Sequence, residues 1–174
     1  AALGNDVTVI DSRAAPPGLA ELREIHPEIP VILETQDPRW LEGIDQVAWS
    51  PGLRIDTPLA AHARQQGIPI VGDIELFARA AQAPVLAVTG SNGKSTVVTL
   101  LERMLSATGL DVAAGGNLGP PALELLAEPA DIYLLEISSF QLETTESLRP
   151  DVAAVLNVSP DHLDRHGSLA DYAA

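Results

Sequence analysis

Short apolar runs recur along the chain, and a polar or glycine-rich segment follows each of them. The runs cover residues 7–10, 31–33, 46–49, 68–71, 85–88, 112–114, 132–135 and 152–156. Runs of this kind, rich in β-branched residues, are typical of strands in a parallel sheet. Apolar residues at helical spacing predict helices between them, over 19–26, 40–44, 57–66, 74–81, 94–108 and 120–126. This alternation predicts an α/β fold with two parallel sheets in series and right-handed crossovers. Residues 82–84, Gln-Ala-Pro, are the expected linker between two domains, 1–82 and 83–174.

A glycine-rich turn, Thr89-Gly-Ser-Asn-Gly-Lys-Ser-Thr96, joins the run 85–88 to the predicted helix that follows it. Lysine in the first turn of a helix opposes the positive end of the helix dipole, so an anion is expected nearby. Backbone N–H groups of Gly90, Ser91, Asn92, Gly93 and the first helical residues can converge on a phosphate. Lys94 would then reach the outer phosphates, while the hydroxyl of Ser95 or Thr96 would face a magnesium ion.

The strict phosphate-loop pattern is not met, because its first glycine would fall at position 88, which is Val88. An ordinary strand-to-helix turn is therefore an alternative interpretation. Lys94 is the only lysine among ten basic residues, the other nine being arginine. Its place at the phosphate position favours the phosphate-binding interpretation.

Composition restricts the possible ligands and partners. The 174-residue chain is 46% hydrophobic, which is enough for a core, and its net charge of −14 argues against a nucleic-acid partner. Phosphate ligands would have to be held locally, by N–H groups, one lysine, a few arginines and a metal ion. Zero cysteine, no signal peptide and no apolar run of membrane-spanning length favour a cytoplasmic protein without a membrane partner.

Other polar residues follow the predicted strands. Asp11 comes directly after the strand 7–10, where nucleotide-binding folds contact a ribose or a base, although a turn residue is the alternative. Ser50-Pro51-Gly52 follows the strand 46–49 and offers a hydroxyl and a close backbone approach, or is a plain turn. Glu136 ends the strand 132–135, where a magnesium-ordering carboxylate is expected, with a helix cap as the alternative.

Asp161 and His162 follow the last predicted strand, level with Glu136 and Lys94, and form a candidate cluster for magnesium and phosphate. His162 and His166 also have the spacing of a zinc-binding helix. The zinc-protease pattern places glutamate where this chain has Leu163, so a zinc site is discounted.

Four segments together resemble the Mur ligase family of cell-wall synthesis. They are Thr89 to Thr96, Gly116-Asn-Leu-Gly119, Leu135-Glu-Ile-Ser-Ser-Phe-Gln-Leu-Glu143 and Asn157-Val-Ser-Pro-Asp-His-Leu-Asp-Arg-His-Gly167. The similarity runs from about Asp11 to Tyr172. Within the family, the Ser-Ser-Phe-Gln-Leu-Glu segment and Ser50-Pro51-Gly52 resemble members that add D-glutamate to UDP-N-acetylmuramoyl-L-alanine.

The resemblance implies a cytoplasmic ATP-dependent ligase, expected to be a monomer, that serves peptidoglycan synthesis and hence cell shape and division. ATP would phosphorylate the terminal carboxylate of UDP-N-acetylmuramoyl-L-alanine, and the amine of D-glutamate would attack the acyl phosphate. This chain would hold most of a Rossmann-like domain, without its first strand, and part of a P-loop-type ATP-binding α/β domain. The family's third domain and its carbamylated lysine would lie outside the chain, so we expect this piece alone to be inactive.

The resemblance also implies residue roles. Gly90 to Thr96 would bind the ATP phosphates, with Lys94 on the transferred one. Ser95 and Glu136 would hold one magnesium ion, His162 would ligate a second, and Asn117 would lie near the substrate carboxylate. The set Asp11, Ser12, Arg13, Ser50, Pro51 and Gly52 would lie along the UDP part of the substrate.

Two alternatives stay open. Folylpolyglutamate synthase shares the phosphate loop, but the Ser-Ser-Phe-Gln segment disfavours it. A non-catalytic nucleotide-binding module or switch ATPase would bind nucleotide without ligation. Glu136 and the Asp161-His162 segment are the features that a simple switch would not need.

Overall fold

The chain folds as two compact units, and a computed structural model describes its residues 4–173. The first unit holds residues 1–45 and 56–68, and the second holds residues 46–55 and 69–174. The domain division expected at residue 83 stays a prediction. None of the helices between residues 4 and 173 combines the length and the apolar character that crossing a bilayer requires.

The first unit contains two short parallel strands and three helical segments. These are β1 (Val9–Ile10), α1 (Leu19–Ile25), β2 (Val31–Ile32), the 3-10 helix η1 (Pro38–Leu41) and α2 (Pro58–Gln65). α2 begins as the sequence predicts, with Pro58 in its first turn and the Thr57 hydroxyl accepting the Ala60 N–H at 3.2 Å. The helix expected over 40–44 is wrong. A 3-10 turn forms earlier instead, because the Asp37 carboxylate accepts the Arg39 N–H and caps it there.

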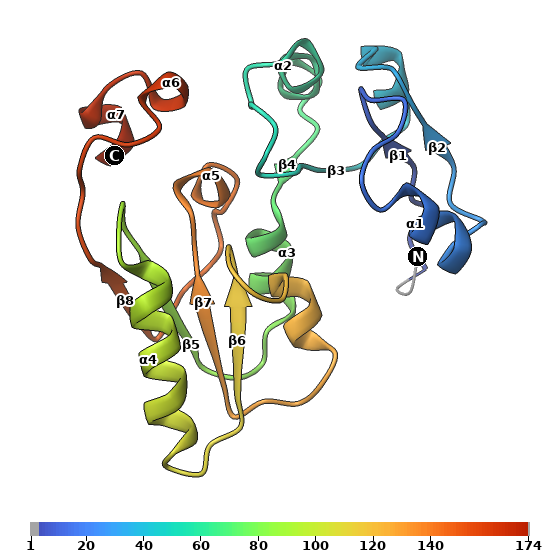
Figure 1. Cartoon of the computed structure of the whole chain (residues 1–174). Coiled ribbons are helices and arrows are strands. Elements are labelled where there is room, and N and C mark those ends of the chain that lie inside the picture. The colour runs from blue at the N-terminus through green and yellow to red at the C-terminus, as the bar shows by residue number, and fades with distance from the viewer. Residues whose placement is uncertain (1–3, 174) are drawn as a thin grey trace. The chain divides into compact units, whose positions relative to one another are not determined.

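All strand pairs of the second unit are parallel. β3 (Val47–Ala48) pairs with β4 (Ile70–Val71), and a four-stranded sheet has the order β6-β7-β5-β8. Its strands are β5 (Val85–Thr89), β6 (Val112–Gly116), β7 (Ile132–Glu136) and β8 (Val152–Val155). Figure 1 shows this sheet with α4 (Lys94–Ser106) on one face and α3 (Asp73–Ala80) with the 3-10 helix η2 (Ala122–Leu126) on the other. The parallel α/β fold class is confirmed.

The expectation of two sheets in series needs a correction. The four amino-terminal strands form two separate pairs, β1-β2 and β3-β4, each only two residues long. Pro30 and Pro69 stand at the starts of the predicted strands 31–33 and 68–71, and their carbonyls accept from Val9 and Val47. Proline has no N–H to donate, which shortens both ladders at this end.

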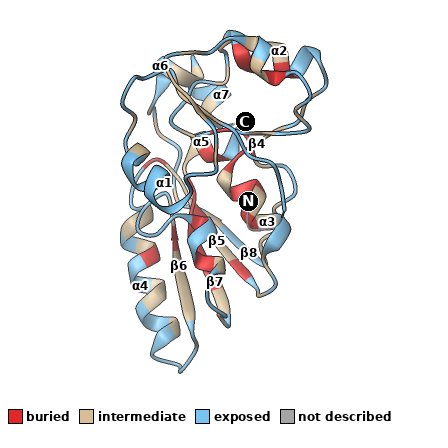
Figure 2. Cartoon of the chain, turned by 90° about the vertical axis from the view of Figure 1, so that its right-hand side faces the viewer, coloured by how far each residue is buried: buried red, intermediate tan, exposed pale blue. Residues whose placement is uncertain are grey.

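The two faces of the large sheet pack against different helices. Tyr133, Leu135 and Ile137 point to the face that α3 covers and share a cluster with Ile74 and Phe77. Leu134 lies on the opposite face with Val88 and Val98. Buried residues accordingly gather on β5, β7 and α3 (Figure 2). Because successive side chains of a strand alternate between faces, Glu136 belongs to the face of Leu134, which is the face of α4.

Two predicted helices differ in detail from the structure. In place of the α-helix predicted over 120–126, Ala122–Leu126 form the 3-10 helix η2, with Pro121 as its cap. In α4 the packed residues are Val97, Val98 and Leu101, whereas Leu100 and Met104 are each 57% exposed. The packed apolar residues of α4 therefore lie in its first two turns.

A buried carboxylate fastens α3 to the segment before β8. Glu75 is 2% exposed, and its Oε2 accepts the backbone N–H groups of Glu146 and Ser147, each at 2.8 Å. Its Oε1 accepts from Arg79 Nε at 2.9 Å. Burial by itself raises the pKa of Glu75, but these hydrogen bonds outweigh burial and lower the pKa to about 2.

We predict that Glu75→Gln destabilises the protein by about 1–3 kcal/mol at neutral pH, because an amide cannot supply both carboxylate oxygens to three donors. A carboxylate with a lowered pKa stabilises the fold above its ordinary pKa, and this contribution is lost as the pH falls toward about 2. The difference between wild type and variant in urea unfolding should therefore shrink below about pH 4. Glu124→Gln, at an exposed position, is the matched control, and equal stabilities of the Glu75 variant and wild type would contradict the prediction.

Candidate nucleotide and metal site

The candidate site begins at the carboxyl end of β5. β5 pairs with both β7 and β8, and the chain that leaves it runs through α4 to β6, on the far side of β7. β8 lies on the other side of β5, so connections diverge at this point of the sheet edge. Open parallel sheets bind ligands at such a switch point. The loop 90–93 stands there, as the sequence predicts.

The loop turns sharply into α4. Gly90 and Gly93 have φ angles of 140° and 85°, in the region that favours glycine. A Cβ on Gly90 would come within 3.1 Å of the backbone N and O of Asn157. Lys94 is the first residue of α4, and its Nζ donates to the carbonyls of Gly90 at 2.7 Å and Ser91 at 3.4 Å. The ammonium group therefore lies over the loop, at the start of a helix of 13 residues.

Residues after β8 hold the loop from its other side. Asn157 Oδ1 accepts the Asn92 N–H at 2.9 Å, and Asn157 Nδ2 donates to the Asn92 carbonyl at 2.9 Å. The Ser91 N–H donates to the Asn157 carbonyl. The Ser91 hydroxyl contacts the backbone of Ser159 and, at 3.0 Å, the Tyr172 hydroxyl. We call this set, Asn157 with Ser159 and Tyr172, the loop clasp.

The loop clasp was not assigned from the sequence. One signal could have found Asn157: it comes soon after β8, which is a parallel neighbour of β5, so both strands end at one edge. Ser91 is 7% exposed and fully engaged in the clasp, so its hydroxyl is structural in this arrangement.

Glu136 and Asn117 lie together at the next strand ends. Glu136 is 2% exposed, and its Oε1 accepts from Asn117 Nδ2 at 2.8 Å. Its Oε2 is buried and has no hydrogen-bond partner. A buried carboxylate oxygen with free lone pairs is suited to a cation. Glu136 does not cap a helix, because Ser138 caps α5 (Ser139–Leu142) with Gln141 in a capping box.

Gly116 allows the backbone before Asn117 to come close to Glu136. Its φ is 110°, and a Cβ there would lie 2.4 Å from the Glu136 carbonyl oxygen. The Asn117 N–H donates to that same carbonyl at 2.8 Å. Position 116 therefore requires glycine for Asn117 to lie beside Glu136.

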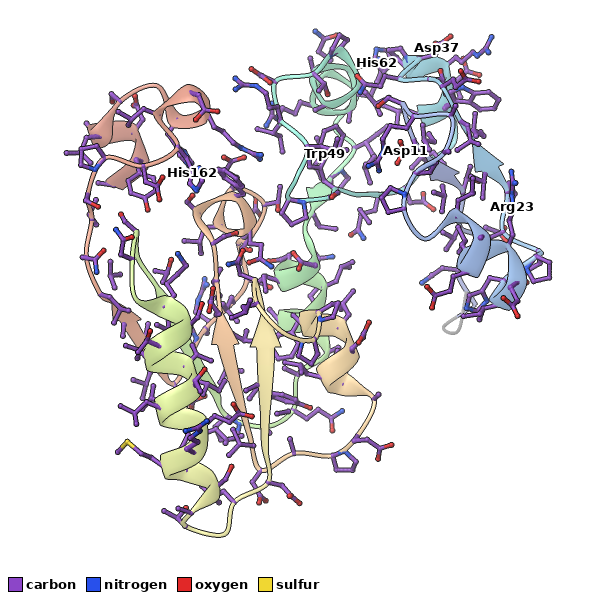
Figure 3. The ribbon with its side chains drawn as sticks, in the orientation of Figure 1. Asp11, Arg23, Asp37, Trp49, His62 and His162 are labelled. Carbon is purple, nitrogen blue, oxygen red and sulfur yellow. The ribbon has the colours of Figure 1, made fainter. Side chains whose placement is uncertain are left out.

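His162 reaches toward α5 from the last part of the chain (Figure 3). It precedes α6 (Leu163–His166) with a left-handed φ of 50°, and its ring lies 4.7 Å from the Phe140 ring. The His162 side chain is 49% exposed, and its Nε2 is 3.8 Å from Asp161 Oδ2. Across residues 4–173, no group of three or more His, Asp or Glu side chains is arranged to hold a metal ion.

The residues expected along UDP lie in both units. In the first unit, Asp11 accepts from Arg13 through Nε at 2.9 Å and Nη2 at 2.7 Å. The side-chain hydrogen bond from Arg13, followed by that from its backbone N–H, lowers the pKa of Asp11 to about 2. Ser12 is exposed between them. In the second unit, Ser50, Pro51 and Gly52 form a turn closed by the Leu53 N–H on the Ser50 carbonyl at 3.0 Å.

The structure thus brings some predicted residues together and leaves others apart. The loop and Lys94 are joined, as are Asn117 and Glu136. Ser95, half-buried, and Thr96, exposed, follow Lys94 in the first turn of α4. Among the described residues, no hydrogen bond or ion pair joins Lys94 to Glu136 or to His162.

Comparison with known proteins finds similarity along nearly the whole chain. The Mur ligase MurD-like N-terminal domain model matches residues 1–72, and the Mur ligase middle domain model matches residues 88–174. UDP-N-acetylmuramoylalanine–D-glutamate ligases of Nitrosococcus oceani and Marinobacter nauticus are each 52% identical, over 99% and 97% of this chain. The chain spans 38% of the length of each. A solved UDP-N-acetylmuramate-alanine ligase from Thermotoga maritima shares the fold, with a TM-score of 0.56 at 24% identity, over 98% of this chain and 40% of its own.

We predict that Asn157→Ala loosens the loop, because the Asn92 N–H loses its acceptor. Hydrogen exchange of the Asn92 amide should quicken about fivefold, as expected for losing one hydrogen bond of about 1 kcal/mol. Asn157→Asp is the matched variant, since it keeps the acceptor and loses only the donor to the Asn92 carbonyl. Equal exchange of this amide in wild type and in Asn157→Ala would contradict the clasp.

Proposed function

We propose that this chain, which belongs to the Mur ligase family, carries the ATP-binding part of a cytoplasmic ligase that adds D-glutamate to UDP-N-acetylmuramoyl-L-alanine. The single observation that supports this most is the loop 90–93 with Lys94 at the switch point of the sheet. Identity of 52% to ligases named for this reaction supports the choice of substrates. Since the chain spans 38% of those relatives, the complete reaction belongs to the full-length protein.

Gly90 to Thr96 would bind the phosphates of ATP. The N–H groups in the first turn of α4 have no acceptor within the helix, and the helix dipole adds positive potential at the same point. Lys94 adds a full charge there and would contact the phosphoryl group that is transferred. In a chain with a net charge of −14, this local concentration of donors is what makes polyphosphate binding possible.

Ser95, Glu136 and His162 are the residues proposed to hold magnesium. Of these residues, Glu136 best supports the proposal, because it offers a buried oxygen without a partner on the same side of the sheet as α4. Asn117 fixes the other oxygen of that carboxylate, so the open one keeps a defined direction. Magnesium would neutralise phosphate charge during phosphoryl transfer.

The chemistry requires positive charge before the reaction begins. A carboxylate becomes a useful electrophile only after one of its oxygens is converted into a good leaving group, and here both reactants are anions. Lys94 and the loop N–H groups would hold the phosphoryl group in place for attack by the substrate carboxylate. Asn117, which is exposed beside Glu136, would donate a hydrogen bond to the substrate carboxylate. The amine of D-glutamate would then attack the acyl phosphate and displace phosphate.

The remaining predicted residues would recognise the nucleotide part of the substrate. Asp11, Ser12 and Arg13 are proposed for one segment of UDP, and the turn Ser50, Pro51 and Gly52 for another. Arg13 already engages Asp11 with two hydrogen bonds, so the pair presents one nearly neutral surface rather than two separate charges. Ser50 and Gly52 are exposed, so a ligand could reach them.

We predict that the full-length protein forms ADP only when both UDP-N-acetylmuramoyl-L-alanine and D-glutamate are present. Lys94→Ala should abolish this activity, because the loop 90–93 loses the positive charge that would hold the transferred phosphoryl group; removing such a preorganised charge costs about a hundredfold or more in kcat. A coupled assay of ADP release measures the rate. Arg103→Ala, at an exposed position of the same helix, is the control for folding and charge.

Rapid ATP hydrolysis without the muramoyl substrate would favour a switch ATPase instead. ADP release that depends on a folate and L-glutamate would favour the folylpolyglutamate synthase alternative. Either result would overturn the proposed function.

A further inference from the structure

The Arg165 side chain makes several polar contacts outside the proposed site. Its guanidinium makes four hydrogen bonds, to Glu143 Oε1 and Oε2 at 2.9 and 2.7 Å and to the carbonyls of Pro51 and Leu53 at 2.9 Å each. It also lies 4.1 Å over the Phe140 ring, and its side chain is only 9% exposed. Arginine is suited to this arrangement because its planar fork can serve several acceptors at fixed angles.

The contacts link three segments that are far apart in sequence. Glu143 and Phe140 belong to the α5 region, directly after β7 and Glu136. Pro51 and Leu53 belong to the turn that follows β3. Arg165 itself lies in α6, three residues after His162. All three segments are in the second unit.

On the turn side, the held atoms are backbone carbonyls. The Leu53 carbonyl accepts from Arg165 Nη2 and also from Trp49 Nε1 at 3.2 Å, and Trp49 is 6% exposed. These two hydrogen bonds from Arg165 use neither the Ser50 hydroxyl nor the Gly52 backbone, and both residues are exposed. Arg165 thus fixes the turn through its backbone carbonyls.

On the α5 side, Arg165 binds the carboxylate of Glu143. Glu143 receives a two-pronged hydrogen bond, which is among the stronger polar contacts in proteins, at a site where its side chain is 20% exposed. The Phe140 ring that supports Arg165 also contacts the His162 ring. The same guanidinium therefore contacts both the turn 50–53 and the Phe140 ring.

We propose that Arg165 is a positioning residue that fixes the turn Ser50–Leu53 for the nucleotide part of the substrate by bracing it against Glu143. This inference rests on the proposed function only for the identity of the ligand. Arg165 itself does not touch substrate in this assignment. Its loss should weaken binding at the turn and leave ATP binding at the loop 90–93 largely unchanged.

The test uses the full-length enzyme and steady-state kinetics with each substrate varied in turn. In Arg165→Met, which keeps the apolar stem but no donors, the KM for UDP-N-acetylmuramoyl-L-alanine should rise about tenfold while the KM for ATP stays unchanged. Arg165→Lys should fall between, because an ammonium keeps the charge but has three donors on one atom in place of the planar fork that makes four hydrogen bonds. Glu143→Gln should have the smallest effect, because the guanidinium still donates to the turn. Arg103→Met, at an exposed arginine, is the matched control.

A merely structural role would give a different pattern. Equal rises in both KM values, or an unchanged KM for the nucleotide substrate in folded Arg165→Met, would overturn the inference. If Arg165→Met fails to fold, Arg165→Lys decides, and an unchanged KM there overturns it.

A second readout needs no substrate. The Leu53 amide donates to the Ser50 carbonyl, so its hydrogen exchange reports directly on the turn. Faster exchange of the Leu53 amide in Arg165→Lys is expected, and unchanged exchange overturns the brace even if the protein proves inactive as a ligase. Inactivity of the wild type together with faster exchange in the variant would instead overturn only the proposed function.

Discussion

The parallel pairing of β5 with β7 on one side and β8 on the other is the constraint on which the rest of the second unit depends. Parallel strands end at the same edge of a sheet, so the segments that leave these strands are brought to one place. The register sets Val88 opposite Glu136 and Thr89 opposite Val155. The glycine-rich loop, the buried carboxylate and the segment containing Asn157 therefore meet because of backbone hydrogen bonds. Their side chains then refine an arrangement that the ladder has already imposed.

The net negative charge of the chain explains why phosphate binding would depend on a few closely spaced donors. An acidic chain repels polyphosphates at long range, and only a dense local set of donors can reverse this. Lys94, the start of α4 and the loop N–H groups form such a set, and Asn157 keeps the loop in shape without adding charge. Glu136, by contrast, places negative charge at this edge of the sheet and would attract a cation. An unpartnered oxygen in a buried carboxylate is costly unless a cation accompanies it, which couples the ligand-binding edge to metal.

Local sequence patterns predicted the elements whose partners are fixed by local rules. β5, β7, β8, α4 and the Thr57 cap of α2 follow from apolar runs, glycine positions and a cap next to proline. The two 3-10 segments and the divided amino-terminal strands did not, because caps and prolines shortened elements whose apolar patterns extend further. Asn157 with Asn92 and Arg165 with Pro51 could not be paired either. They are 65 and 114 residues apart, and no periodicity relates positions at such separations. The roles of Lys94, Glu136, Asn117 and His162 stay predictions, for which the structure supplies positions and partners.

β8 has a further physical consequence. Within residues 4–173 it stands at the border of its sheet, hydrogen-bonded to β5 alone, with Val152 and Val155 exposed by 58% and 66%. A strand border with free amide and carbonyl groups and uncovered aliphatic side chains is a template for adding another strand. This polypeptide studied alone at high concentration will therefore tend to self-associate along that border, and dilute conditions will keep it dispersed.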